Sequence, residues 1–502
     1  MGMLTNTKFN ISKKIDTPIF FSVIFYLIFF GIFFRFSGLV HPMSFFCDEG
    51  GLIHNVRVKN YLDLFLPLNQ NQCCPPIFMV LSKIVYSFSG IDEFWLRILP
   101  FCSSAASLLL FSFLVLKLFK NKISVIFAIT LFAFNLKLIN FSYIFKHYST
   151  DCLFSILILM FALHVKNIEP TVKNSIFAAF FFLICVFSSY TSLLIILPFL
   201  FIYLIKLYKK NLFREKRTQI LKALSTFCLC FFPITGLYFL KNCVPNIEND
   251  FFQLFWGKYV MFYPKDIASI KDFFIFLSGV PKYCFPAIFF LSEIATYLLF
   301  KKNKFLFLLL TLPFAFSLLL GLLAIYPFCA ERTCLFLIPL FIIFVSYPFE
   351  TDFAKNSVIK ITTITTGIIL FAAQICYCLS YNESKLTEEY TISNIRQQYE
   401  LLEKSDITKD DYIFPNYYNR DLFIEYDRQK KYDSSKLIQK FTKGELIDFF
   451  PDKSNIYFFL SDKYVLYSKD IEKTVRENCK IIYEADGYYG NFIKCYYEKK
   501  DK

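Results

Sequence analysis

Long apolar runs constrain this chain more than any other feature of its sequence. Of its 502 residues, 56% are hydrophobic and 19% are charged, and the mean hydropathy is +0.47. Apolar runs close to the ~20 residues that cross a bilayer as a helix recur as far as residue 380. This pattern excludes a soluble globular protein and predicts an all-α polytopic membrane domain, because backbone in hydrocarbon must satisfy its own hydrogen bonds.

The runs predict about eleven transmembrane helices. We interpret the first as a retained helix, because it is longer than the apolar core of a signal peptide and no small-x-small cleavage site follows it. Two neighbouring runs are divided only at residues 188–192, so the count depends on that boundary. The expected spans are 18–36, 93–117, 122–141, 150–165, 174–190, 191–208, 221–240, 273–300, 303–326, 333–349 and 357–379.

Basic residues indicate the orientation, because they favour cytoplasmic loops. They gather before the first span and in alternate loops, which places the N-terminus in the cytoplasm and the first long loop and the C-terminal tail outside. They account for much of the net charge of +14 and form no single stripe, so we exclude nucleic acid as a partner. The residues are Lys8, Lys13, Lys14, Lys117, Lys120, Lys122, Lys166, Lys173, Lys206, Lys209, Lys210, Arg214, Lys216, Arg217, Lys222, Lys301, Lys302, Lys304, Lys355 and Lys360.

The tail is polar and rich in tyrosine, and it predicts a small extracytoplasmic α/β domain. We therefore divide the chain into a membrane domain, 1–380, and an outer domain, 381–502. The patterns predict strands at 411–415 and 455–460, a helix at 463–478, and a hairpin of 480–483 with 491–496 around 486–490.

The chain has 16 cysteines, and none has a Cys-x-x-Cys or Cys/His spacing that suits zinc. Most lie in apolar runs, where cysteine acts as a small apolar residue. Cys479 and Cys495 are equidistant from the hairpin centre. They could form a disulfide in an oxidising compartment, or they could remain thiols.

The first outer loop, residues 37–92, carries the acidic pair Asp48 and Glu49 close to the first span. Carboxylates near hydrocarbon are costly, so the pair indicates a functional role, although a solvated loop is the plainer alternative. A helix-like stretch follows at 52–66. Pro75-Pro76 then leads an apolar helix at 77–88 that is too short to span, and we expect this helix to lie in the membrane interface.

The order of these features resembles the GT-C glycosyltransferases, in particular the bacterial branch related to protein O-mannosyltransferases and to aminoarabinose transferases of lipid A. The resemblance covers roughly residues 18–350. Two positions depart from the family: Gly50-Gly51 stand where several relatives have an arginine, and Cys74 stands where a lysine is frequent. The matching motifs are Asp48-Glu49, Pro75-Pro76, Arg97-Ile98-Leu99-Pro100, Lys146-His147-Tyr148-Ser149-Thr150-Asp151 and Tyr326-Pro327-Phe328-Cys329-Ala330-Glu331-Arg332.

The resemblance implies transfer of a sugar from a polyprenyl phosphate to a hydroxyl of a lipid, glycan or protein outside the membrane. Such a transfer needs a base at the acceptor and cations at the departing phosphate. We assign the base to Asp48, while Glu49 assists, binds the acceptor or caps a helix. Arg332 and Lys146 are the phosphate candidates, although Arg332 could instead pair with Glu331, and Lys146 could only snorkel.

The remaining candidates have less specific roles. Tyr148 and Asp151 would orient Lys146 or contact the sugar, and Arg97 would bond within the outer loop, for example to Asp92 or Glu93. His54, Arg57 and His147 are candidates for hydrogen bonds or phosphate contact, with a structural role as the alternative for both histidines.

The leaving group would be a monophosphate ester, so the resemblance requires no cofactor and no metal. Asp48 and Glu49 could nevertheless hold one divalent cation. Single displacement implies inversion at the anomeric carbon. The implied location is a bacterial inner membrane, with membrane lipids as further partners.

A transporter or flippase, or a polymerase of lipid-linked glycans, is the alternative. A transporter should carry charged or helix-broken positions at mid-membrane together with internal repeats. The expected spans contain few ionisable residues, and the candidates gather at one face, which favours an enzyme. Four prolines interrupt the expected spans, so a transporter remains an alternative to an enzyme. They are Pro198, Pro233, Pro286 and Pro313.

Overall fold

The structure is a computed structural model, and it describes residues 18–40, 45, 47–166, 168–209, 216–247, 267–323, 325–350, 357–384, 402, 411–414, 454–459, 468–487 and 490–498. The chain divides into two compact units, which we treat one at a time. The first comprises Met1–Leu39, Pro100–Tyr143 and His147–Ser380, and the second comprises Val40–Leu99, Ile144–Lys146 and Tyr381–Lys502. The predicted boundary at residue 380 stays a prediction.

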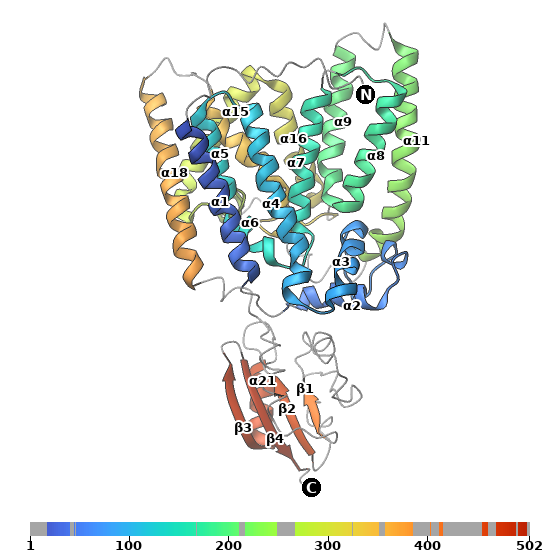
Figure 1. The fold of residues 1–502 in the computed structure, drawn as a ribbon, viewed down its shortest axis with the longest axis vertical. Coiled ribbons are helices and arrows are strands. Elements are labelled where there is room, and N and C mark those ends of the chain that lie inside the picture. The colour runs from blue at the N-terminus through green and yellow to red at the C-terminus, as the bar shows by residue number, and fades with distance from the viewer. Residues whose placement is uncertain are drawn as a thin grey trace. The chain divides into compact units, whose positions relative to one another are not determined.

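Long helices make up the first unit and stand side by side (Figure 1). Between them lie short helical turns, written η. The elements are α1 (Pro18–Val40), α4 (Glu93–Leu118), α5 (Lys122–Ala133), α6 (Leu136–Asn140), η2 (Phe141–Tyr143), α7 (Tyr148–Val165), α8 (Val172–Ser188), η3 (Tyr190–Ser192), α9 (Leu193–Lys209), α11 (Arg217–Asn242), α12 (Val244–Ile247), α14 (Ile267–Ser278), η4 (Lys282–Cys284), α15 (Phe285–Lys302), α16 (Lys304–Leu322), η5 (Arg332–Leu337), α17 (Ile338–Ser346), η6 (Tyr347–Phe349) and α18 (Ser357–Ser384).

The helices confirm a polytopic membrane protein. In the described ranges, nine are long and apolar enough to cross a bilayer, and a bent pair, α5 with α6 and η2, makes ten. The sequence predicted about eleven. The eleventh predicted run, at 174–190, forms α8, an apolar helix of 17 residues that stands at the lower end of the range for a span.

The predicted span at 273–300 is also interrupted, because the chain breaks between α14 and η4. Gly279 has φ +72°, in the left-handed region that favours glycine, and Pro281 precedes η4. A Cβ on Gly279 would stand 2.6 Å from the Asn135 side chain. The break is therefore built from a conformation and a close approach that only glycine provides.

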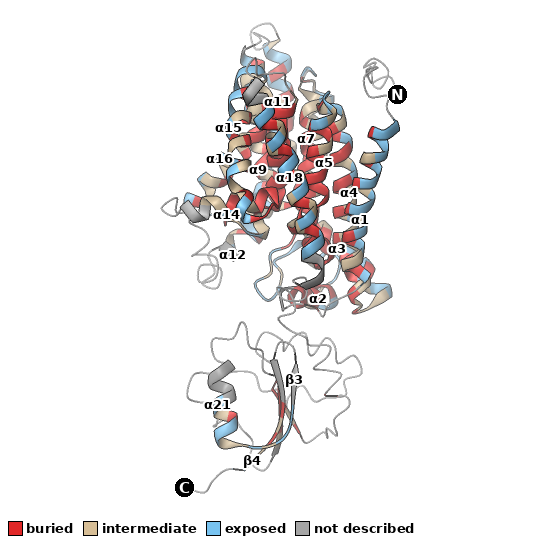
Figure 2. Ribbon diagram, turned by 90° about the vertical axis from the view of Figure 1, so that its left-hand side faces the viewer, coloured by how far each residue is buried: buried red, intermediate tan, exposed pale blue. Residues whose placement is uncertain are grey.

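Along the outer helices, residues on one side are buried and residues on the other side are exposed (Figure 2). On α1, Phe20, Ile24 and Leu27 are buried, whereas Phe25 and Phe29 are more than half exposed. Exposed phenylalanine on one side of a long helix is costly in water and favourable in lipid. The exposed side of α1 is thus suited to face the bilayer, while the buried side packs on the neighbouring helices.

A buried arginine that our sequence reading assigned no role holds the bend between α5 and α6. Arg35 on α1 is fully buried. Its Nη1 donates to the carbonyls of Ala133 (2.8 Å) and Gly31 (2.6 Å), its Nη2 to that of Phe132 (3.3 Å), and its Nε to Ser104 Oγ (2.9 Å). The bonds to Phe132 and Ala133 satisfy carbonyls that the end of α5 leaves without helical partners, which is essential inside a membrane protein.

Two further side chains complete the same bend. Gln374 on α18 donates from Nε2 to the Phe134 carbonyl at 2.6 Å. Asn135 caps α6 by accepting from the amides of Lys137 and Leu138. The broken helix is therefore stabilised by polar groups from several spans.

The C-terminal residues form the predicted α/β fold. The sheet has the order β1-β2-β4-β3, with β1 parallel to β2 and the other pairs antiparallel. The predicted strands, hairpin and helix are confirmed, except that residues 415, 460, 463–467, 488 and 489 lie outside the described residues. The elements are β1 (Tyr412–Phe414), β2 (Ser454–Phe459), α21 (Ser468–Asn478), β3 (Lys480–Gly487) and β4 (Gly490–Tyr497).

Replacing Arg35 by alanine should destabilise the first unit by about 3 kcal/mol, because it leaves buried carbonyls without donors. Thermal unfolding of the detergent-solubilised protein measures the loss. Phe33→Leu, at an exposed position on the same helix, is the matched control and should unfold like wild type. Equal stability of Arg35→Ala and wild type would contradict the role given to Arg35.

Candidate functional site

The acidic pair lies in the first turn of a short helix in the second unit. The helix, α2 (Cys47–Val58), begins earlier and ends sooner than the predicted 52–66, and it is followed by η1 (Asp63–Phe65) and α3 (Pro76–Ser89). A first turn suits carboxylates, because its free amides and the helix dipole favour negative charge. The short loop helices expected from the sequence are confirmed, with Pro76 in the first turn of α3.

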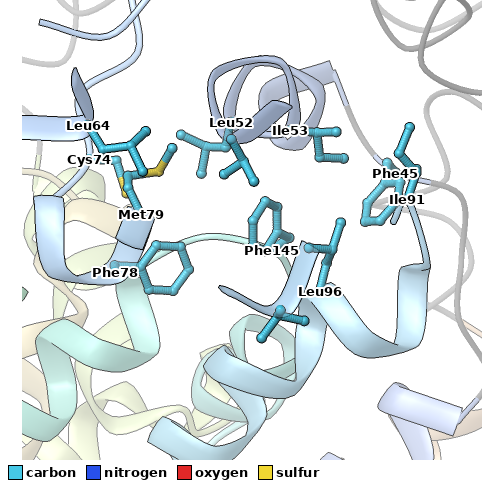
Figure 3. Packing of buried hydrophobic residues seen from close by; sticks show 12 residues of the cluster. Phe45, Leu52, Ile53, Leu64, Cys74, Phe78, Met79, Ile91, Leu96 and Phe145 are labelled. Atoms are coloured by element: carbon cyan, nitrogen blue, oxygen red, sulfur yellow. The ribbon is translucent and has the colours of Figure 1, made fainter. Parts of the chain in front are cut away.

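An apolar cluster joins α2 and α3 to the start of α4 and to the segment 144–146 (Figure 3). Leu52 of α2, Phe78 and Met79 of α3, Leu96 of α4 and Phe145 are all buried in it. The rings of Phe78 and Phe145 lie 5.8 Å apart. Because burial of each such side chain contributes roughly 1.5–3 kcal/mol, this cluster fixes the turn that carries the acidic pair.

Glu49 is held by a buried ion pair. Arg97 of α4 donates from Nε to Glu49 Oε1 at 3.0 Å and from Nη2 to Oε2 at 2.8 Å, and the amide of Phe145 donates to Oε1 at 2.5 Å. Both side chains are at most 3% exposed. Through the paired bonds to the guanidinium and the bond from the backbone amide, Glu49 connects α2 with α4 and with the segment that contains Phe145. The partner that the structure gives Arg97 is thus Glu49.

Lys146 belongs to the same unit and is buried. Its Nζ donates to the side-chain oxygen of Gln72 at 2.8 Å. Gln72 in turn packs against Gly51 of α2, where a Cβ would meet its amide nitrogen at 2.6 Å. The glycine pair after Asp48 and Glu49, which departs from the family pattern, therefore has a packing role at Gly51.

Two further candidates, His54 and Arg57, lie on α2. His54 is half-buried and Arg57 is exposed on α2. The side chain of Asp48 lies outside the described part of the chain, so its catalytic role stays a prediction.

A second group of candidates lies in the first unit. The guanidinium of Arg332, at the start of η5, lies over the Tyr148 ring at 5.7 Å from its centroid, within reach of a cation–π contact. His147 Nε2 is 3.7 Å from Asp151 Oδ2. Asp151 is buried and accepts a hydrogen bond from Ser189 at 2.7 Å. The structure therefore brings Tyr148 and Arg332 together, and His147 and Asp151.

Two hydroxyl-bearing residues near this group, Ser189 and Tyr326, were given no role in the sequence analysis. Ser189 also bonds Thr191 (3.0 Å), in the hydroxyl-rich break between α8 and α9 that the sequence showed only as a boundary. Tyr326 donates to the Thr333 carbonyl at 2.5 Å, and burial raises the pKa of its hydroxyl well above the usual value. Tyr326 therefore stays protonated at neutral pH and acts as a hydrogen-bond donor.

Among the described side chains, no group of three or more His, Cys, Asp and Glu residues is close enough to hold a metal ion. Glu49 in particular is a poor ligand, because Arg97 already engages both carboxylate oxygens.

The polytopic helical unit, the long first loop with its short helices and the small C-terminal sheet together form a fold that is similar to solved structures of ArnT. ArnT from Cupriavidus metallidurans has this fold. Its structure bound to undecaprenyl phosphate matches with a TM-score of 0.53 and 10% sequence identity, covering 95% of this chain and 97% of ArnT. Its apo structure matches with the same TM-score and coverage and 11% identity.

The oligosaccharyltransferase of Archaeoglobus fulgidus is a more distant match, with a TM-score of 0.47 and 12% identity over 93% of this chain and 72% of that one. No family model matches the chain, and no curated protein matches its sequence. At these identities, the likeness to ArnT concerns the fold.

Removing one partner of the buried Glu49–Arg97 ion pair should destabilise the protein. Arg97→Leu should cost about 3–5 kcal/mol, because it leaves a buried carboxylate without its cation. The double variant Glu49→Leu/Arg97→Leu should recover part of that loss, because neither charge then remains buried alone. Thermal unfolding of both variants and wild type measures this, and a double variant less stable than Arg97→Leu would contradict the pairing.

Proposed function

We propose that the protein is a membrane glycosyltransferase that moves a sugar from a polyprenyl phosphate to a hydroxyl on the outer face of the membrane. The observation that carries the proposal is the fold likeness to ArnT, whose structure was determined with undecaprenyl phosphate bound, over 95% of this chain. The acceptor belongs to a lipid, a glycan or a protein.

Asp48 is the proposed base. It accepts the proton of the acceptor hydroxyl while the acceptor oxygen bonds to the anomeric carbon and the bond from that carbon to the phosphate oxygen breaks. Support comes from its position in the first turn of α2 and from its neighbour Glu49, whose ion pair with Arg97 holds that turn in place. Glu49 is then a positioning residue. A single displacement of this kind inverts the anomeric configuration.

Cations hold the departing phosphate in this proposal. Lys146 is buried, and its ammonium donates a hydrogen bond to the side-chain oxygen of Gln72. Arg332 is half-buried over an aromatic ring, and its planar fork suits two phosphate oxygens. With these cations, the reaction proceeds without a metal.

The membrane in which the protein lies and its orientation there belong to the same proposal. The chain is a multi-pass protein of a bacterial inner membrane, with its N-terminus in the cytoplasm and its C-terminal domain outside. This orientation rests on the basic loops, which favour the cytoplasm.

Transport of a lipid-linked glycan is the second candidate. Two observations favour it: Arg35 is buried within a span, and helices break at the α5–α6 bend and between α14 and η4, as in transporters. However, the bonds of Arg35 go to backbone carbonyls and a serine of the protein itself. We therefore assign Arg35 to the scaffold and prefer transfer.

Asp48→Asn should lower turnover by about 10²–10⁴-fold, because the amide cannot accept the hydroxyl proton. Purified protein in bilayers, given radiolabelled polyprenyl-phosphate hexoses, reports release of the sugar. The matched control is Asp63→Asn in the same loop, which should keep wild-type turnover. Equal turnover of Asp48→Asn and wild type would remove Asp48 from the mechanism, and wild type without turnover on any donor would favour transport.

Arg332→Gln should slow sugar release by about 10²–10³-fold, as expected when a donor to a developing oxyanion is lost. Arg332→Lys should recover part of the rate, because it restores charge without the fork. The same radiolabel assay measures both variants. Wild-type rates in Arg332→Gln would show that this cation does not contact the phosphate.

A further inference from the structure

Two cysteines of the C-terminal sheet lie on one face of a hairpin. Cys495 is on β4, directly opposite Ile481 of β3, and Cys479 stands two residues before Ile481. Cys479 immediately precedes β3, so continuing the strand pairing by one residue would make it a diagonal neighbour of Cys495, which is within reach across an antiparallel pair.

Packing brings the two thiols together. Cys495 is fully buried in the apolar cluster of the sheet with Ile456 and Val475, and Cys479 packs against that cluster while remaining half-buried. The side chains of Cys479 and Cys495 are hydrogen-bonded to each other. Both are thiols in the structure.

The two thiols differ in acidity. The hydrogen bond from Cys495 lowers the pKa of Cys479, whereas the same bond and then burial raise the pKa of Cys495. A more acidic, more accessible thiol beside a buried partner is the arrangement of an attacking and a resolving cysteine.

We propose that Cys479 and Cys495 are a thiol–disulfide exchange site that accepts a disulfide from an oxidising dithiol protein. The thiolate of Cys479 attacks one sulfur of the incoming disulfide, whose S–S bond breaks as the first partner thiolate leaves and takes up a proton. Cys495 then gives up its proton and attacks the Cys479 sulfur, which releases the second partner thiol. The incoming disulfide is thereby reduced by two electrons, and the cysteine pair is oxidised to a disulfide.

The product ties Cys479, which follows α21, to Cys495 near the C-terminal end of β4, and it closes the chain between residues 479 and 495. A link of this kind stabilises a small outer domain that has only a modest core. The proposal rests on the orientation that places the tail outside, where disulfides persist, and not on sugar transfer.

The test uses the full-length protein in intact cells. Cells are treated with N-ethylmaleimide before lysis, and the peptides of the purified protein are analysed by mass spectrometry without reduction. We expect a disulfide-linked pair of peptides containing Cys479 and Cys495, while the exposed Cys73 carries the maleimide and shows that blocking worked. Maleimide on both Cys479 and Cys495, or a link that forms only when blocking is omitted, would overturn the proposal.

A second measurement guards against variants that misfold. Reduction should lower the unfolding temperature of wild type and leave that of Cys479→Ser unchanged. The order of attack is tested with oxidised glutathione, which should label Cys479 in Cys495→Ser faster than it labels Cys495 in Cys479→Ser. An equal effect of reduction on wild type and Cys479→Ser would contradict the link. Because these readouts concern thiols, they can fail while sugar transfer succeeds, and the reverse.

Discussion

The buried ion pair of Glu49 and Arg97 is the interaction on which the candidate site depends. It joins the first turn of α2 to the first turn of α4, and the Phe145 amide brings in a third segment. A buried charge pair contributes little net stability compared with apolar packing, but losing one partner is expensive. The pair therefore acts mainly as a geometric constraint. It fixes the helical turn in which Asp48 stands.

Buried polar side chains also hold the shape of the helical unit. Its bend between α5 and α6 exposes carbonyls in a region without water, and Arg35 and Gln374 supply the missing donors. Polar residues inside membrane proteins commonly mark function. Here they maintain the shape of a broken helix, which explains the charged and bent positions within the helical unit.

Local patterns predicted much of the fold. Apolar runs predicted the long helices, and alternation with turn residues predicted β2, β3 and β4 close to their observed bounds. The interruption at Gly279 was missed, because a single glycine in an apolar run does not reveal the Asn135 side chain that lies against it. The helix at 174–190 was predicted, and it forms α8, an apolar helix of 17 residues.

For the candidate site, too, the sequence predicted which residues matter but not which residues they contact. The acidic, proline and basic motifs resemble those of a known enzyme family, and that resemblance selected Glu49, Lys146, Asp151 and Arg332 as candidates. It did not reveal that Glu49 binds Arg97, that Lys146 meets Gln72, or that Asp151 meets Ser189.

The sequence by itself determined the class of protein, because hydrophobic length and helix periodicity are properties of short stretches of chain. Only the tertiary structure decided which polar groups pair and which thiols meet. Such pairs join residues 48 positions apart, as Glu49 and Arg97 are, or 38 apart, as Asp151 and Ser189 are. Their energies depend on burial and on hydrogen-bond geometry, and neither exists until the chain has folded.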